Sequence, residues 1–186
     1  ENYDPDLLKE LSQEVYKNST RLSTMILNML DLATLDVKKL ELNRMLVNLY
    51  ELVENRVRYC AKTYIENKPI DIKLSAEKDL LANLDPDYMR QMIDNLLINA
   101  IRFSEEGLIE VKLMQMQQGR NNFVRIEVID EGSGIPENEL YEIFTPFKMG
   151  SKHESKAQGR GVGLSLCSSV AEAHGGAIKA ENFARE

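Results

Sequence analysis

The sequence lacks several features that would assign it to a class at once. It contains no tryptophan, and its two cysteines, Cys60 and Cys167, are too far apart to suggest a disulfide framework or a zinc-binding pattern. We therefore expect both cysteines to be buried thiols in a reducing compartment. No apolar run approaches the roughly 18 residues that are needed to span a bilayer. The sequence does not begin with methionine, so we expect it to be a piece of a larger protein whose membrane segments would lie upstream.

Positive charge is also scarce in this chain. The 186 residues include 23 Lys and Arg against 30 Asp and Glu, which gives a formal net charge of −7. This balance argues against a general nucleic-acid-binding surface, and we expect no nucleic-acid partner. The composition is otherwise 43% hydrophobic and 28% charged, which is typical of a globular protein with a substantial core.

Residues 5–37 contain no glycine and no internal proline, and apolar residues recur there at alternating spacings of three and four. This heptad pattern predicts a long helix, and a second apolar row in its later half suits a four-helix bundle. The heptad seam consists of Leu8, Leu11, Val15, Asn18, Leu22, Met25, Met29, Leu32 and Asp36. One helix cannot bury this face alone, so a partner helix is expected from upstream, from a second copy, or from both. The alternative is that the helix packs on the domain that follows.

The remainder of the chain alternates short strands with helices, and a domain boundary is expected after residue 38, giving domains 1–38 and 39–186. The predicted strands are 40–43, 70–74, 80–84, 108–116, 123–129 and 177–181. The predicted helices are 46–66, 86–103 and 162–174, with a short helix or turn at 136–144. Asp85 is a plausible N-cap for the helix that begins at Pro86.

The helix predicted at 86–103 carries polar residues in an otherwise apolar stretch. Asn95, Asn99 and Arg102 are four and three residues apart, so they lie on one side of the helix. Because asparagine is a mediocre helix former, two of them one turn apart require an explanation. They are either solvent-facing amides, or an amide oxygen for a hard cation beside an arginine that binds phosphate.

Two glycine clusters follow. In the first, residues 130–136, Asp130 either caps a tight turn or holds a ligand to which Gly132 and Gly134 allow close approach. The second, residues 159–164, begins a helix, where exposed backbone N–H groups form an anion site. It follows a lysine-containing loop, which is either part of that site or a solvated surface.

Together these segments resemble four motifs of sensor histidine kinases, in the order of that family. Residues 95–104 resemble the N box, 130–136 the first glycine box, 144–147 the F box and 159–164 the second glycine box. The resemblance implies an α+β fold, namely a two-layer α/β sandwich of the GHKL (Bergerat) type with a mixed sheet, preceded by a long bundle-forming helix. It also implies that the ligand is ATP with Mg²⁺.

Carried over residue by residue, the resemblance implies specific roles in the site. Asn99 would coordinate Mg²⁺, with Asn95 beside it near the phosphates. Arg102 would contact phosphate, Phe103 would border the adenine, and Asp130 would accept from the adenine amino group. Asn95 and Arg102 would take part directly in catalysis. The other residues implied to contact ATP are Gly132, Gly134, Ile135, Lys148, Arg160, Gly161, Val162, Gly163 and Leu164.

The sequence departs from the family pattern in two respects that matter. Arg160 stands where a small residue, often threonine, is usual. Neither His153 nor His174 has the residues that follow the family's phosphoacceptor histidine, so that histidine is absent and autophosphorylation by this chain alone is not expected.

The resemblance thus implies the ATP-binding catalytic domain and the second dimerisation helix of a cytoplasmic kinase segment. It would transfer the γ-phosphoryl group to a histidine on a helix not present here, for relay to a response-regulator aspartate. Homodimerisation would use the 5–37 helix, and a membrane would be reached only through upstream segments. The alternatives are a non-catalytic scaffold that signals by dimerising and an ATP-driven conformational switch, whose gyrase-type relatives carry a water-activating glutamate at the position of Asn95.

Overall fold

The structure is a computed structural model of the 186-residue chain, and it separates into two compact units, Glu1–Lys38 and Lys39–Glu186. The residues that it describes are 7–8, 11–12, 14–15, 18–19, 22, 40–65, 67–76, 78–119, 121–146, 148 and 162–183. None of the described helices is long and apolar enough to cross a membrane.

In the first unit, all of the described residues are helical, as the heptad pattern predicts. Their large apolar side chains, including Leu8, Leu11, Val15 and Leu22, are at least half exposed. The later seam residues Met25, Met29, Leu32 and Asp36 lie outside the described residues.

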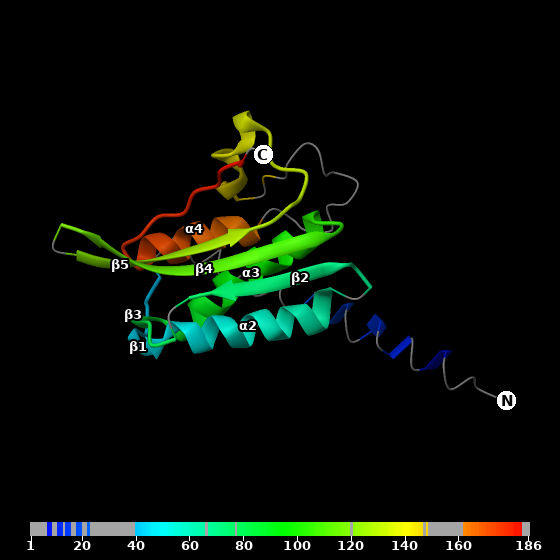
Figure 1. The fold of residues 1–186 in the computed structure, drawn as a ribbon, viewed down its shortest axis with the longest axis horizontal. Helices are drawn as coiled ribbons and strands as arrows, with labels where there is room; N and C mark the ends of the chain where they lie inside the picture. Colours follow the sequence, from blue (N-terminus) through cyan, green and yellow to red (C-terminus); the bar gives the residue numbers. More distant parts are fainter. Residues whose placement is uncertain are drawn as a thin grey trace. The chain divides into compact units, whose positions relative to one another are not determined.

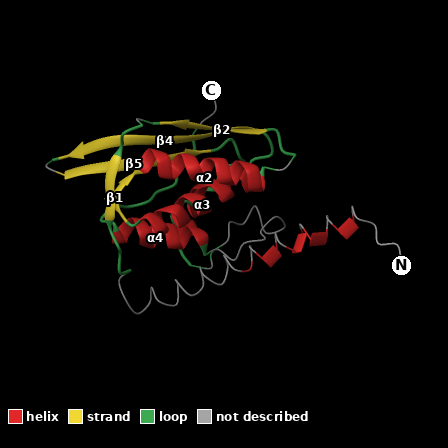
Figure 2. Ribbon diagram, turned by 90° about the horizontal axis from the view of Figure 1, so that it is seen from below, coloured by secondary structure: helices red, strands yellow, loops and turns green. Residues whose placement is uncertain are grey.

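The second unit has one layer of helices on one face of a β-sheet, which Figures 1 and 2 show from two sides. The helices are α2 (Leu49–Tyr64), α3 (Pro86–Phe103) and α4 (Gly163–Ala173), with the short 3-10 helices η1 (Glu137–Glu139) and η2 (Glu142–Phe144). The strands are β1 (Met45–Asn48), β2 (Ile70–Ser75), β3 (Leu81–Leu84), β4 (Gly107–Gln118) and β5 (Asn121–Ile129).

The main sheet is mixed, with β4 in its centre. β2 runs parallel to β4, β5 runs antiparallel to it, and β1 pairs separately with β3. Ile109, Val111 and Leu113 of β4 alternate with more exposed residues, so they present one apolar face to the helices. A mixed sheet covered by helices on one face confirms the predicted two-layer α/β sandwich.

α3 lies between α2 and α4 in the helical layer (Figure 2). It spans the predicted residues, and Asp85 caps its N-terminus as expected. Ile93 and Leu97 are completely buried, and burial of a side chain of this size contributes about 2 kcal/mol to folding. The end of the helix is marked by Ser104, whose N–H donates to the Ala100 carbonyl at 3.0 Å. α3 therefore links the core of this unit to the residues of the predicted N box.

Both cysteines are buried free thiols, which confirms the expectation for their side chains. Burial raises the pKa of Cys60 and that of Cys167 to about 12. The thiols therefore stay protonated at neutral pH and behave as small apolar groups.

Two of the predicted strands are wrong. Residues 40–43 have no regular structure. The strand β1 instead begins at Met45 and occupies the first residues of the helix predicted at 46–66. Asn48 explains the shift, because its Oδ1 accepts from the Glu51 N–H at 3.2 Å and starts α2 one residue later. Residues 177–181 also form no strand, since they pair with no described strand. Local alternation cannot reveal whether a partner edge is available.

Candidate functional site

The middle of α3 lies directly against the start of α4. A Cβ atom added to Gly163 would be 3.1 Å from Asn95 Oδ1 and 3.3 Å from Asn95 Cγ. A glycine at the first position of α4 therefore allows this close approach. The fold thus brings together the asparagine-bearing helix and the second glycine cluster, which are separated by more than sixty residues in the sequence.

Asn95 carries an amide nitrogen, Nδ2, that is buried without a hydrogen-bond partner among the described residues. Such a donor costs about 1–3 kcal/mol when it stays unpaired. Native proteins rarely tolerate this, and a functional site is one of the usual reasons. Asn99 and Arg102 follow on the same helix and are half-buried.

The start of α4 has the properties of an anion site. Val162 is the N-cap residue, and its apolar side chain cannot accept a hydrogen bond from the first turn. The backbone N–H groups there carry the positive end of the helix dipole. Leu164 is half-buried in the same turn. Arg160 and Gly161 lie outside the described residues, so only the second half of this glycine cluster is described.

The first glycine cluster lies on the C-terminal end of α3. A Cβ atom on Gly132 would be 2.9 Å from the carbonyl oxygen of Phe103 and 2.6 Å from Asp130 Oδ1. The Gly132 N–H donates to Asp130 Oδ1 at 2.8 Å. The Asp130 side chain is exposed, and Ile135 at the end of the loop is half-buried. Asp130 therefore caps a turn, as the first interpretation of this stretch predicts, and Gly132 permits a close approach of that turn to the Phe103 backbone.

Two residues to which the sequence analysis gave no role anchor this loop. Glu131 Oε2 accepts from the Leu108 N–H at 3.2 Å, directly over Gly107, whose φ is +101°. Asn182 binds the backbone of Ile135 with both ends of its amide. Their partners are 23 and 47 residues away in the sequence, so no local pattern could have identified them.

Lys68 is a third residue without a predicted role, and it satisfies the C-terminal end of α3. Its Nζ donates to the carbonyls of Ile101 at 2.7 Å, Ser104 at 2.8 Å and Arg102 at 3.4 Å. A lysine at a helix C-terminus also interacts favourably with the helix dipole. The backbone that carries Arg102 and Phe103 is therefore held in place from outside the helix.

Lys148 is exposed beyond η2, and its Nζ pairs with Glu142 Oε2 at 2.8 Å. The hydrogen bond and the charge of Glu142 raise the pKa of Lys148 above its ordinary value. The lysine that the resemblance implies to contact ATP thus pairs with a carboxylate in this structure.

Hydrogen bonds hold together the opposite end of the helical layer, where α3 begins and α4 ends. His174 closes α4: its Nε2 accepts from the Asp85 N–H at 3.0 Å, and its Nδ1 lies 2.8 Å from the Val170 carbonyl. His174 therefore holds the start of α3 to the end of α4, which agrees with its predicted place at a helix C-terminus. His153 lies outside the described residues.

Asp85 forms most of the hydrogen bonds at the start of α3. Its carboxylate accepts from the backbone N–H groups of Asp87, Tyr88 and Asn43 at 2.8–3.1 Å. Burial raises the pKa of Asp85, but the hydrogen bonds from Tyr88, Asn43 and Asp87 outweigh burial and lower the pKa below its ordinary value.

In the described part of the chain, no group of three or more His, Cys, Asp or Glu side chains could hold a metal ion. An amide oxygen, Asn95 Oδ1, instead lies beside Gly163 of the second glycine cluster, and Asn99 follows one turn later on α3. Amide oxygen is a suitable ligand for Mg²⁺, which takes one or two protein ligands and completes its octahedron with water and phosphate. The donor set of α3 therefore fits a magnesium ion that arrives with a phosphate ligand.

Comparison with known proteins agrees with this geometry. The sequence family described as "Histidine kinase-, DNA gyrase B-, and HSP90-like ATPase" matches residues 84–185. The chain is 34% identical over 177 residues to the sensor protein KdpD of Clostridium acetobutylicum, and the match covers 94% of this chain and 19% of KdpD. It is 31% identical over 176 residues to the sensor histidine kinase ZraS of Salmonella typhimurium, covering 94% of this chain and 35% of ZraS. The chain thus spans about a third or less of the length of these relatives.

Solved structures share the fold. The catalytic domain of histidine kinase ThkA, in a nucleotide-free form, aligns with a TM-score of 0.64 and 29% identity, covering 77% of this chain and 90% of that one. Full-length ShkA, in complex with AMPPNP, aligns with a TM-score of 0.74 at 22% identity, covering 96% of this chain and 36% of that one. Since the family profile covers more than half of the sequence, the chain belongs to the histidine kinase-, DNA gyrase B- and HSP90-like ATPases and carries the catalytic ATP-binding domain of a sensor histidine kinase.

Proposed function

We propose that this chain binds Mg-ATP along α3, with the base at the first glycine cluster and the phosphates at the second. The observation that carries the proposal is the position of α3 between the two clusters. Asn95, in its middle, meets Gly163, and Phe103, at its end, meets Gly132. One helix therefore contacts both ends of the proposed pocket. ShkA, which has the same fold, was determined in complex with AMPPNP.

At the phosphate end, Asn99 would supply an oxygen to Mg²⁺, with Asn95 beside it and Arg102 on a phosphate. The unpaired Nδ2 of Asn95 would find an acceptor in a phosphate oxygen. The N–H groups at Gly161 and Gly163 would receive further phosphate oxygens. Lys148 and Arg160 are proposed phosphate contacts from the segment between η2 and α4.

At the base end, the exposed carboxylate of Asp130 would accept a hydrogen bond from the adenine amino group. Guanine has a carbonyl oxygen at that position and would be repelled. Gly132 and Gly134 would let the base approach the backbone. The pocket would be bordered by the half-buried or buried side chains of Phe103, Ile135, Val162 and Leu164.

The bound metal ion would neutralise charge on the phosphates, and catalysis would otherwise consist of positioning. Asn95 would orient the γ-phosphate, and Arg102 would stabilise the charge that develops on it. Asn95 stands where gyrase-type relatives carry a water-activating glutamate, so we expect ATP hydrolysis to be slow.

In the parent protein, the γ-phosphoryl group would pass to a histidine on a helix outside this chain and from there to a response-regulator aspartate. Residues 1–38 would be the second helix of the dimerisation domain, and residues 39–186 the catalytic domain in the cytoplasm. The names of the relatives, a sensor histidine kinase and a "Two-component system protein A" of Emericella nidulans, support this proposal.

Titration of the chain with Mg-ATP and with Mg-GTP, followed by calorimetry, tests the pocket. We expect ATP to bind more tightly than GTP. The assignment of Asp130 is wrong if ATP does not bind or if both nucleotides bind equally.

The metal role of Asn99 is tested by the Asn99→Ala variant, titrated with ATP over a range of Mg²⁺ concentrations. We expect weaker ATP binding and a weaker dependence on Mg²⁺. An affinity that matches the wild type at every Mg²⁺ concentration would remove Asn99 from the metal site.

Transfer requires a separately made partner helix that carries the acceptor histidine, mixed with the chain and radiolabelled ATP. An acid-labile phosphate on that helix would support the kinase. If ATP binds but no phosphate is transferred, the non-catalytic scaffold becomes the better proposal.

A further inference from the structure

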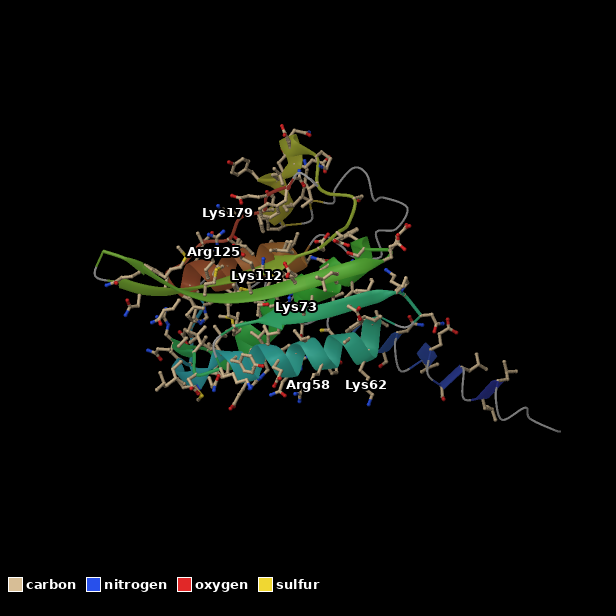
Figure 3. All side chains as sticks on the ribbon, viewed as in Figure 1. Arg58, Lys62, Lys73, Lys112, Arg125 and Lys179 are labelled. Carbon is tan, nitrogen blue, oxygen red and sulfur yellow. The ribbon has the colours of Figure 1, made fainter. Side chains whose placement is uncertain are left out.

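The C-terminal segment after α4 returns past β5 to the loop that follows β5 (Figure 1). Lys179 on this segment and Arg125 on β5 are both labelled in Figure 3. Hydrogen bonding to Lys179, together with the charges of Lys179 and Arg125, lowers the pKa of Glu181 below its ordinary value. The next residue, Asn182, reaches the first glycine cluster, where it forms hydrogen bonds with the Ile135 backbone.

Asn182 binds both polar groups of the Ile135 backbone. Its Oδ1 accepts from the Ile135 N–H at 3.0 Å, and its Nδ2 donates to the Ile135 carbonyl at 2.6 Å. Two bonds to the N–H and the C=O of one residue are what a neighbouring strand supplies in an antiparallel sheet. Here a single side-chain amide supplies both, and these bonds fix the end of the loop.

The loop needs such an anchor because of Gly134. Its φ is +69°, a left-handed conformation that glycine adopts at no steric cost but leaves just as easily. A Cβ atom on Gly134 would lie 3.0 Å from Asn182 Oδ1. The other end of the loop is already held by the bond from Gly132 to Asp130 and by the bond from Leu108 to Glu131. Asn182 supplies a further restraint, on the far side of the flexible glycine.

We propose that Asn182 is a positioning residue for recognition of the base. By holding the Ile135 backbone, it keeps the loop 130–135 in the one shape in which Asp130 meets the amino group of adenine. This inference rests on the proposed role of Asp130. Because Asn182 forms its bonds at the surface, we expect its removal to relax the loop and to leave the buried core intact.

The test compares Asn182→Ala with Asn182→Asp in the whole chain. The aspartate keeps an acceptor for the Ile135 N–H but loses the donor and faces the Ile135 carbonyl with negative charge. We expect both variants to bind Mg-ATP about tenfold more weakly, because the loop loses its preorganisation. Mg-GTP and inorganic triphosphate should bind as they do to the wild type, so the ATP preference falls. Lys179→Ala, which removes a neighbouring contact of the same segment, is the matched control and should change none of these affinities.

The outcomes separate this inference from the function on which it rests. If the wild-type chain shows no preference for ATP over GTP, the proposed role of Asp130 fails, and the present inference fails with it. If the wild type prefers ATP and both variants keep that preference, Asn182 has no positioning role although the proposed function stands. If the variants lose ATP, GTP and triphosphate binding equally and melt at a lower temperature, Asn182 is only a structural tether, and the inference is overturned.

Discussion

The two halves of α3 differ in how their polar groups are paired. At the N-terminal end, the polar groups of Asp85 all have hydrogen-bond partners. From the middle of α3 onward, some buried polar side-chain atoms have none among the described residues. Asp85 accepts three backbone N–H groups and donates its own to His174. In the other half of the helix, Asn95 Nδ2 and, at the cap, Ser104 Oγ are buried without a partner in the described part of the chain. The backbone carbonyls of Ile101 and Ser104, in contrast, accept from Lys68.

This difference distinguishes polar groups that stabilise the fold, such as those of Asp85, from polar groups that can bind a ligand, such as the amide of Asn95. A paired polar group at a helix end stabilises the folded state by roughly 1–2 kcal/mol. An unpaired donor lowers stability by a similar amount and persists where a function requires it. α3 thus combines a stabilising end with a binding face.

The largest expected effect is on the structural end. Asp85→Ala should lower the free energy of unfolding by about 2 kcal/mol, because it removes the N-cap and leaves the Asn43 N–H without an acceptor. Urea denaturation measures this. Asp87→Ala removes an exposed carboxylate of the same first turn that pairs with Arg90, and it should cost about 0.5 kcal/mol through the helix dipole and that ion pair. Equal losses for the two variants would contradict the assigned role of Asp85.

The Asp85 carboxylate should also make stability depend on pH. The pKa of Asp85 in the folded protein lies below its value of 3.8 in the unfolded chain. Its stabilisation is therefore complete above that value and is lost as the pH falls through the folded pKa. The stability difference between wild type and Asp85→Ala should be constant from about pH 5 to 7 and narrow below about pH 4. If the stability difference between the two proteins instead widens in acid, the pKa of Asp85 is raised in the folded protein and not lowered.

Two glycines with left-handed backbone conformations, one beside the proposed binding site and one at the structural end, allow a matched comparison. Gly134 has a φ of +69° in the first glycine cluster, and Gly175 has a φ of +81° at the end of α4. Substitution of either by alanine should cost about 1 kcal/mol of stability through backbone strain. Only Gly134→Ala should weaken ATP binding as well. Calorimetry on both variants tests the comparison, which fails if Gly175→Ala weakens ATP binding to the same extent.

The smallest effect on stability is expected at the binding face. Asn95→Leu replaces a buried unpaired amide with an apolar group of similar size, so stability should be unchanged or rise by up to about 1 kcal/mol. Mg-ATP binding should be lost. A destabilisation as large as that of Asp85→Ala would show that Asn95 has a structural role.

Much of the fold could be predicted from local patterns. The Asp-Pro pair and the apolar spacing gave both ends of α3, and the two glycine clusters were located as loops next to a strand and a helix. The strand expected at 177–181 was wrong because its alternation gave no information about a partner. The roles of Lys68, Glu131 and Asn182 also could not be predicted, since each acts on backbone groups 23 or more residues away.

The sequence by itself determined which chemical groups are present, their order, and the family to which they are similar. Periodicity and capping are local, so they determine where α3 begins and which of its residues share a face. Only the tertiary structure decided that Asn95 lies against Gly163, that Gly132 lies against Phe103, and that Asn182 closes the loop. Such contacts depend on packing between segments that are distant in the chain, which no local pattern encodes.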